Sequence, residues 1–362
     1  MFSEDVQSFL GPGDRAPNFV LPAADGLLWV FYERVRGFRN ILLVCPAGWR
    51  EAEGELTALA DAWPRLQELG VDVFALFDGG VEETARLSEG LSLPFLVFAD
   101  PEGRFRVPYA KGFGRDPSRP VCLLLDENQR VGTVLDAAEE SFAARALAAF
   151  ASGPPAGPAE LRAGTAPVLI VPDVLDSGAC ASLIALWHGS HEEGVAQGRD
   201  MDGQDVVKVD YAYKKRRDHQ VEDPRAAAWL GRVLSRRVGP ELAKAFHLDR
   251  FAFDRFVVTC YDAERGDYFR PHRDNTTEGT QDRIYAMTLN LNTGDYTGGG
   301  LRFPEYGPQL YAPPAGGAIL FSCSLIHEAT PVTEGQRFTL LTFLRDPEGA
   351  GDGGKLGVWG KR

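Results

Sequence analysis

A histidine and an aspartate stand two positions apart in the segment YFRPHRDN, residues 268–275, which follows a β-like run. In a strand, residues i and i+2 face the same side of the sheet. His272 and Asp274 can therefore present an imidazole nitrogen and a carboxylate oxygen to one point, while Arg273 faces away. An isolated His-x-Asp pair is a weak indication of a metal site, because an ordinary charged turn can contain one.

A third candidate ligand, His327, occurs in SLIHEATPV, directly after the apolar run AILFSCS. Two histidines and one carboxylate form the facial triad that suits Fe(II) and leaves three coordination positions open. Near neutral pH, imidazole is neutral and aspartate is ionised, which are the forms that bind a metal. The alternative for His327 is a hydrogen-bonded residue at a sheet edge.

Arg337 lies ten residues after His327, inside the otherwise apolar segment RFTLLTFL. An arginine is costly to bury unless a carboxylate pairs with it. No acidic residue alternates with Arg337 in this strand, so the sequence favours a ligand carboxylate held bidentately by the guanidinium. Thr339, two positions on, faces the same side and could bind the same carboxylate. A structural salt bridge to a distant Asp or Glu is the alternative.

The segments around these residues have the pattern of a β-rich domain. A strand and a helix are expected in APVLIVPDVLDSGACASLIALW, with Asp176 or Ser177 as the N-cap, and a second helix is expected over about 224–246. Strands follow, separated by turns rich in Gly, Pro, Asp and Asn: FAFDRFVVTCYD, RIYAMTLNLN, GLRFPEY, AILFSCS and RFTLLTFLR. This pattern predicts a sandwich or barrel with the helices packed outside.

Taken in order, four segments of residues 167–345 resemble the prolyl-hydroxylase-like branch of the 2-oxoglutarate and Fe(II)-dependent dioxygenases. They are PHRD, GGGLRFPEYGP, PPAGGAILFSCSLIHEATPV and GQRFTLLTF. The resemblance implies an α+β domain built on a double-stranded β-helix, or jelly roll, with flanking helices. It also implies that His272, Asp274 and His327 bind Fe(2+), and that Arg337 holds the distal carboxylate of 2-oxoglutarate.

Two features depart from the family's pattern. Tyr261 and Tyr268 are the candidates for a further contact with the cosubstrate, but both are out of register with the family's usual tyrosine, so a core position is the alternative for each. Asn290, Leu291 and Asn292 stand where prolyl hydroxylases commonly show Tyr-Leu-Asn. Proline is therefore not favoured as the substrate.

The resemblance also implies the reaction. O2 and 2-oxoglutarate would be converted to succinate and CO2 while the substrate is hydroxylated. Asp274 favours hydroxylation over halogenation, because the related halogenases lack this carboxylate. The substrate is a small molecule or peptide: a residue in a peptide or protein, an amino acid or a small metabolite. The helices before the barrel and the segment from Tyr211 to Gln220 are expected to form the entrance.

The first half of the chain alternates strand-like and helix-like segments, which predicts a layered α/β domain. The Pro/Gly/Ala-rich segment 153–166 is expected to link a domain at 1–152 to the domain at 167–362. GPGDRAPNFVLPAADG and NILLVCPAGWREAEGELTALADAW resemble the opening of a peroxiredoxin, a thioredoxin-like fold. That family's peroxidatic cysteine aligns with Ala52, so the usual peroxidase route is absent.

Cys45 is the nearest substitute thiol, but it and Cys122 follow or occupy apolar strands and are expected to be buried. Arg119 is a candidate match to the family's active-site arginine, with no clear role once the cysteine is missing. The domain is therefore interpreted as a docking or homodimerisation module. Two alternatives for the whole chain stay open: a thiol peroxidase using Cys45, and a non-catalytic binding or scaffold protein with a residual metal site.

Composition excludes several partners. The net charge of -13 repels polyanions, so nucleic acid is not expected to bind. The run Lys214 to Arg217 is interpreted as a solvated loop, with a substrate-facing lip as the alternative. No apolar run approaches the ~18 residues that span a bilayer, and no signal peptide is recognisable. Five cysteines without CxxC spacing favour a reduced, cytoplasmic protein.

Overall fold

The computed structural model describes residues 9–35, 37–153, 161, 164–199, 205–347 and 358–360. The chain divides into two compact units, one within residues 3–159 and one within residues 160–362. Each unit buries its own apolar cores. Within the described part of the chain, no helix combines the length and the apolar character needed to cross a bilayer.

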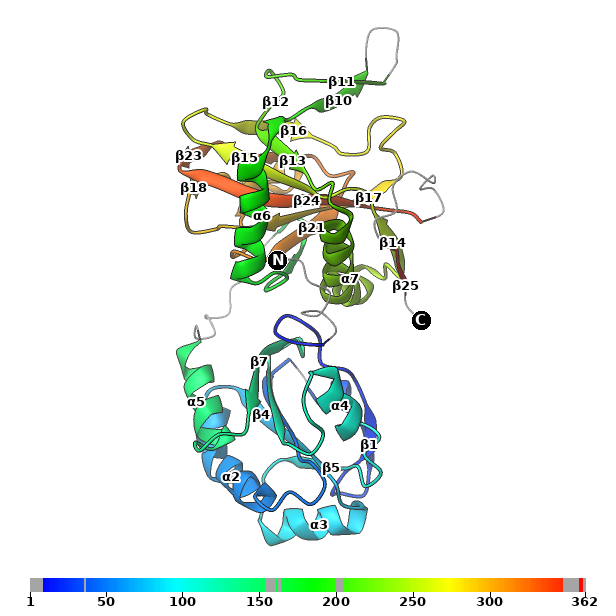
Figure 1. The fold of residues 1–362 in the computed structure, drawn as a ribbon, viewed down its shortest axis with the longest axis vertical. Helices are drawn as coiled ribbons and strands as arrows, with labels where there is room; N and C mark the ends of the chain where they lie inside the picture. The colour runs from blue at the N-terminus through cyan, green and yellow to red at the C-terminus, as the bar shows by residue number, and fades with distance from the viewer. Residues whose placement is uncertain are drawn as a thin grey trace. The chain divides into compact units, whose positions relative to one another are not determined.

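The first unit contains a five-stranded sheet with helices on both faces (Figure 1). Its strands are β3 (Arg39–Val44), β4 (Val71–Phe77), β5 (Leu96–Ala99), β6 (Val121–Leu125) and β7 (Val131–Asp136). The order is β5-β4-β3-β6-β7, with β3, β4 and β5 parallel and the other neighbours antiparallel. This is the thioredoxin-like arrangement that the first half of the sequence predicts.

Burial on both faces explains the uninterrupted apolar runs of this sheet. In β3, Ile41 and Leu43 face one core, while Leu42 and Val44 face the other. The helices are α1 (Phe31–Arg34), α2 (Ala52–Glu68), α3 (Val81–Gly90), α4 (Arg106–Gly112) and α5 (Phe142–Ser152), and a hairpin joins β1 (Val20–Pro22) to β2 (Leu28–Val30).

The second unit is a jelly roll made of two facing antiparallel sheets. The larger contains β8 (Leu169–Val171), β9 (Glu192–Glu193), β13 (Arg217–Gln220), β14 (Arg250–Phe253), β15 (Val257–Asp262), β17 (Arg283–Asn290), β21 (Ala318–Ser322), β24 (Gln336–Arg345) and β25 (Val358–Gly360). Its main path is β8-β21-β17-β24-β15-β13-β9, with β14 pairing β24 and β25.

The smaller sheet contains β12 (Lys214–Lys215), β16 (Tyr268–His272), β19 (Leu301–Arg302), β20 (Leu310–Tyr311) and β22 (His327–Ala329). Its order is β12-β16-β22-β19-β20. Two further pairs are β10 (Ala196–Arg199) with β11 (Asp205–Lys208), and β18 (Thr297–Gly298) with β23 (Val332–Glu334); a 3-10 turn, η2, spans Pro304–Tyr306.

Helices α6 (Ser177–Gly189) and α7 (Pro224–Phe246) lie across the outer face of the larger sheet (Figure 1). Strand alternation separates this face from the space between the sheets. In β24, Phe338 and Leu340 belong to the core shared with the helices, whereas Arg337 and Thr339 line a cavity between the sheets. The longest strand of the unit therefore carries polar groups toward the interior of the jelly roll.

Candidate metal centre

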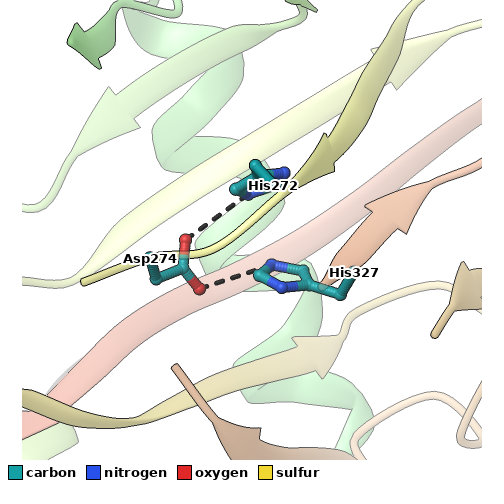
Figure 2. Close-up of side chains that lie close together, drawn as sticks. All are labelled: His272, Asp274 and His327. Atoms are coloured by element: carbon teal, nitrogen blue, oxygen red, sulfur yellow. Dashed lines mark ion pairs between the residues drawn. The ribbon is translucent and has the colours of Figure 1, made fainter. Parts of the chain in front are cut away.

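His272, Asp274 and His327 come together between the two sheets of the second unit. His272 ends β16 and His327 begins β22, and the two residues are paired across these neighbouring strands. One ligand atom from each of the three residues lies within 4.8 Å of the others. Figure 2 shows both imidazoles directed at the carboxylate, with Nε2 of His272 3.4 Å from Oδ1 of Asp274 and Nε2 of His327 3.3 Å from Oδ2.

A β-bulge in β16 orients His272. Between the pairs Phe269↔Ala329 and His272↔His327, β16 has one residue more than β22. Phe269 and His272 therefore face the same side although they are three positions apart, and their rings stack with centroids 3.6 Å apart. This stack fixes the plane of the His272 imidazole.

Backbone carbonyls set the protonation of both imidazoles. Nδ1 of His272 lies 2.7 Å from the carbonyl oxygen of Arg270, and Nδ1 of His327 lies 3.1 Å from that of Leu325. A carbonyl oxygen only accepts hydrogen bonds, so each Nδ1 carries the proton and donates it. Each Nε2 then offers its lone pair toward Asp274, as in metal sites where a second group fixes the tautomer.

The electrostatics favour the metal-binding forms of these side chains. Burial lowers the pKa of His327 to about 4, so this imidazole is neutral near pH 7. Burial alone would raise the pKa of Asp274, but the adjacent His327 and His272 outweigh it and lower that pKa to about 2. Two imidazoles and one carboxylate on one side of a centre fit a divalent transition metal such as Fe(II).

A small cavity of about 60 Å³ extends from the three side chains into the space between the sheets. Arg337 and Thr339 line it together with Tyr261. Arg337 is 3% exposed and donates from Nη2 to Oδ1 of Asn290 at 3.2 Å, but its Nε has no hydrogen-bond partner. Among the described residues, no carboxylate forms an ion pair with this guanidinium. The cavity therefore presents an uncompensated cation opposite the candidate metal ligands.

The glycine-rich segment before β19 allows the Arg337 side chain its position. Gly299 has φ +65°, and a Cβ there would lie 2.9 Å from Cδ of Arg337 and 2.8 Å from Cγ2 of Val332. A larger residue would have to displace Arg337 or adopt a strained backbone. The motif GGGLRFPEYGP thus contributes to the cavity through Gly299, whose lack of a side chain leaves room for Arg337.

A larger cleft of about 670 Å³ meets the same centre from the outside. His272, Asp274, Phe269 and Arg216 line both this cleft and the small cavity. The remaining wall of the cleft comes from the end of α6, from β9, β12, β13 and the turn before β15, and from the loop that follows Asp274. The centre is therefore positioned where the small cavity and the larger cleft meet.

The interpretation of Lys214 to Arg217 as a solvated loop is wrong. Lys214 is 4% exposed and Arg216 7% exposed, and both pair with Asp218, at 3.1 Å from Nζ and 2.8 Å from Nε respectively. Arg216 also donates to the Tyr261 hydroxyl at 2.8 Å. The spacing of Lys214, Arg216 and Asp218 was the available signal for this buried cluster, since alternate residues of a strand face the same side.

The two tyrosines proposed as cosubstrate contacts differ. Tyr261 lines the small cavity, 3% exposed, with the Arg337 guanidinium 5.4 Å from its ring centroid. Tyr268 does not line it: its hydroxyl donates to the carbonyl oxygen of Tyr211 on the other side of β16, so its assignment as a cosubstrate contact is corrected. Arg273 pairs with Glu305, as expected for a side chain directed away from the triad.

Asn290, to which no site role was assigned from the sequence, is fully buried and positions Arg337. Its Oδ1 accepts from that guanidinium, while its Nδ2 donates to the carbonyl oxygen of Pro313 at 3.1 Å. Thr339, also fully buried, shares a hydrogen bond of 2.7 Å with Thr259 on the neighbouring strand. A buried asparagine at the end of an apolar strand was the only signal for Asn290.

The first unit lacks a reactive thiol among these candidates. Cys45 and Cys122 are fully buried, and burial raises the pKa of Cys45 to about 12. Ala52 begins α2, and Arg119 is exposed. A cysteine acts as a nucleophile through its thiolate, which such a pKa suppresses at neutral pH. The proposed peroxidase use of Cys45 is therefore disfavoured.

Comparison with known proteins assigns each unit. Residues 256–345 match the model of the 2OG-Fe(II) oxygenase superfamily, and residues 12–134 match the model of the AhpC/TSA family. The procollagen lysine hydroxylase and glycosyltransferase LH3 of Rattus norvegicus is 34% identical over 124 residues, which are 33% of this chain and 16% of that protein. A PKHD-type hydroxylase of Synechococcus sp. (strain JA-2-3B'a(2-13)) is 31% identical over 102 residues, 25% of this chain and 45% of that protein.

The match thus covers less than half of the length of each of these relatives. A crystal structure of a Pseudomonas putida prolyl-4-hydroxylase aligns with 50% of this chain and 93% of its own, at 17% identity and a TM-score of 0.38. The oxygenase match includes His272, Asp274, His327 and Arg337, and the other match spans most of the thioredoxin-like sheet. The chain therefore joins an AhpC/TSA family domain to a 2OG-Fe(II) oxygenase superfamily domain.

Proposed function

We propose that this protein is a dioxygenase that binds Fe(II) through His272, Asp274 and His327 and hydroxylates an organic substrate at the expense of 2-oxoglutarate and O2. The observation that carries the proposal is the arrangement of the small cavity. Three candidate ligands within 4.8 Å of one another stand at one end, and the unpaired guanidinium of Arg337 stands inside.

A five-carbon keto diacid matches this pair of features, because it has a chelating end and a distal carboxylate. Arg337 would hold the distal carboxylate, with the Thr339 hydroxyl as a second donor and Asn290 keeping the guanidinium in place. The buried walls around it, including Phe321 and Leu301, would exclude water.

When bound, Fe(II) with 2-oxoglutarate and O2 supplies the oxidative chemistry: the keto acid becomes succinate and CO2, one oxygen atom enters the succinate, and the other converts a C–H bond of the substrate to C–OH. The protein's residues orient these partners and shield them. The larger cleft, which shares His272 and Asp274 with the small cavity, is the place for the substrate.

Anaerobic reconstitution with Fe(II) and 2-oxoglutarate tests the proposal. The wild-type chain is expected to give the weak visible absorption of a keto acid chelated to iron, saturating with 2-oxoglutarate. His272→Ala and Asp274→Ala should lose it. Arg337→Gln should keep iron but need a concentration of 2-oxoglutarate higher by roughly tenfold or more, as for the loss of a charge-assisted hydrogen-bond pair.

Arg270→Gln is a suitable control, because the Arg270 side chain contacts Tyr268 and the carbonyl oxygen of Ala212 outside the cavity. This substitution changes the net charge by the same amount as Arg337→Gln does. Absence of the absorption in the wild type, or an unchanged affinity in Arg337→Gln, would contradict the proposal. Absence of the absorption in the wild type would favour a binding protein without dioxygenase activity.

A further inference from the structure

Arginine side chains line both the small cavity and the larger cleft, and their ion pairs distinguish them. Arg216 pairs with Asp218, Arg273 with Glu305, and Arg283 with Asp254. Two others, Arg337 in the small cavity and Arg255 in the cleft, form no ion pair with any described residue. Nε is buried without a hydrogen-bond partner in both, as it also is in Arg216 and Arg283, so the missing ion pair is what sets Arg337 and Arg255 apart.

Arg255 is held in the turn between β14 and β15, and the carboxylate beside it in the sequence is already engaged. Asp254 accepts from Arg283 and Arg345, each at 3.0 Å. Glu222 and Asp223 also line the cleft, but neither pairs with Arg255, and the Asp223 carboxylate caps α7 by accepting from the amide of Arg225. Among the described residues, no carboxylate forms an ion pair with the Arg255 guanidinium, and the nearby Asp254 carboxylate is shared by Arg283 and Arg345.

Neighbouring cations make this position more costly. Lys214 and Arg283 line the same cleft, and the positive charge of Arg255 contributes to lowering the pKa of each, after the larger effect of burial. A buried guanidinium donor that is left unsatisfied destabilises the fold. A bound anion in the cleft would satisfy the donor and reduce the repulsion together.

We propose that Arg255 is a specificity-determining residue that binds a carboxylate of the substrate in the larger cleft. A carboxylate, with one negative charge, matches the one guanidinium of the cleft that has no ion-pair partner among the described residues, since Lys214 and Arg216 share Asp218 and Arg283 pairs with Asp254. A planar guanidinium binds a carboxylate through two parallel hydrogen bonds. The inference rests on the proposed function only in taking this cleft as the substrate site.

Direct binding in the absence of O2 tests the inference without turnover. The full-length chain is loaded with Fe(II) and saturating 2-oxoglutarate, which occupies the small cavity. It is then titrated with N-acetylated alanine, leucine, phenylalanine, lysine and proline, each as the free carboxylate and as the carboxamide, with ligand-observed NMR as the readout. At least one carboxylate should bind the wild type more tightly than its carboxamide, by roughly tenfold or more.

Arg255→Gln should abolish that preference, and Arg255→Lys should retain part of it. Arg273→Gln removes a cation from the same cleft that already has a carboxylate partner, so it should keep the full preference. The affinity of Arg255→Gln for 2-oxoglutarate, measured from the visible absorption, should equal that of the wild type.

The inference is overturned if the wild type prefers no carboxylate in the panel to its carboxamide, or if Arg255→Gln keeps the preference. It is also overturned if Arg255→Gln loses affinity for 2-oxoglutarate by the same factor as for the carboxylate probe. Tighter binding of phenyl phosphate than of every carboxylate would also overturn it. Failure of the wild type to bind 2-oxoglutarate would instead contradict the proposed function, and the probe titration could still be read with Fe(II) alone.

Discussion

Single side chains in the small cavity decide which anion Arg337 can accept. Asn290 contacts the guanidinium with a neutral oxygen, so the hydrogen bond positions Arg337 without cancelling its charge. A carboxylate at the same place would give an internal ion pair, and a ligand carboxylate would then have to compete with it. The choice of amide over acid at residue 290 keeps the cavity able to attract an anion.

Asn290→Asp should therefore weaken 2-oxoglutarate binding more than Asn290→Ala does, although aspartate has nearly the shape of asparagine. We expect the dissociation constant for 2-oxoglutarate to rise by roughly tenfold or more, from competition by a charge-assisted pair. Titration of the anaerobic Fe(II) form by visible absorption measures it. An affinity in Asn290→Asp equal to that of the wild type would show that Arg337 does not bind the cosubstrate.

Residue chemistry made the candidate ligands and Arg337 predictable, because those residue types are costly or unusual in apolar strands unless something pairs with them. The misassignment of Tyr268 has a different origin. Strict alternation counted from His272 would turn Arg270, rather than Phe269, toward the site, and the bulge in β16 reverses this. A bulge depends on pairing with β22, so the sequence of β16 alone does not reveal it.

At the scale of elements, β12 and β13 present two different faces to the structure. Lys214, Arg216 and Asp218 meet on one side and line the larger cleft. On the other side Lys215 donates to the carbonyl oxygen of Arg265, and Arg217 pairs with Asp262 at 2.8 Å. The short basic run is thus divided between a buried cluster and the outer surface of the sheet.

Burial of this face makes stability depend on pH through Lys214. Burial, and next the positive charge of Arg216, lower the pKa of Lys214 to about 8, against about 10.4 in an unfolded chain. Below pH 8 both states are protonated and the burial penalty is fully present. As pH rises from about 8 to about 10.4, the folded state has lost a proton that the unfolded state keeps, so the unfolding free energy rises.

We expect the wild type to gain about 3 kcal/mol relative to Lys214→Gln across that pH range, which is the pKa difference converted to free energy. Denaturant unfolding of the full-length chain at a series of pH values measures it, with Lys208→Gln, at an exposed position, as the control for losing one lysine. A constant difference between wild type and Lys214→Gln over this range would contradict the expectation.

Helices were more predictable than strands for a physical reason. The expected helix over 224–246 matches α7, because Asp223 caps its first turn and Pro224 begins it, both local signals. The expected strand FAFDRFVVTCYD is divided into β14 and β15 by the turn that contains Arg255. Two-residue strands such as β12 and β19 exist only through pairing with distant segments, so their own sequences do not reveal them.

At the scale of the whole molecule, the chain combines one unit that contains a candidate metal centre with another that resembles peroxiredoxins but lacks their reactive cysteine. All five cysteines are buried, and none forms a disulfide. In the AhpC/TSA family domain, Arg106 donates to the carbonyl oxygen of Cys45 at 3.3 Å, which does not bring a donor to the thiol itself. Any chemistry of the molecule is therefore expected from the oxygenase domain, and a docking or dimerisation role for the other unit stays a prediction.

This division predicts that the chain has no thiol peroxidase activity. With a pKa of about 12, roughly one Cys45 side chain in 10⁵ is a thiolate at pH 7, too few for rapid attack on peroxide. After removal of iron by a chelator, wild type and Cys45→Ser should consume hydrogen peroxide in the presence of a thiol reductant at the same low rate. Consumption that survives His272→Ala but disappears in Cys45→Ser would instead assign catalysis to the first unit. A movement of α2 or α4 would then have to expose the Cys45 thiol and allow it to ionise.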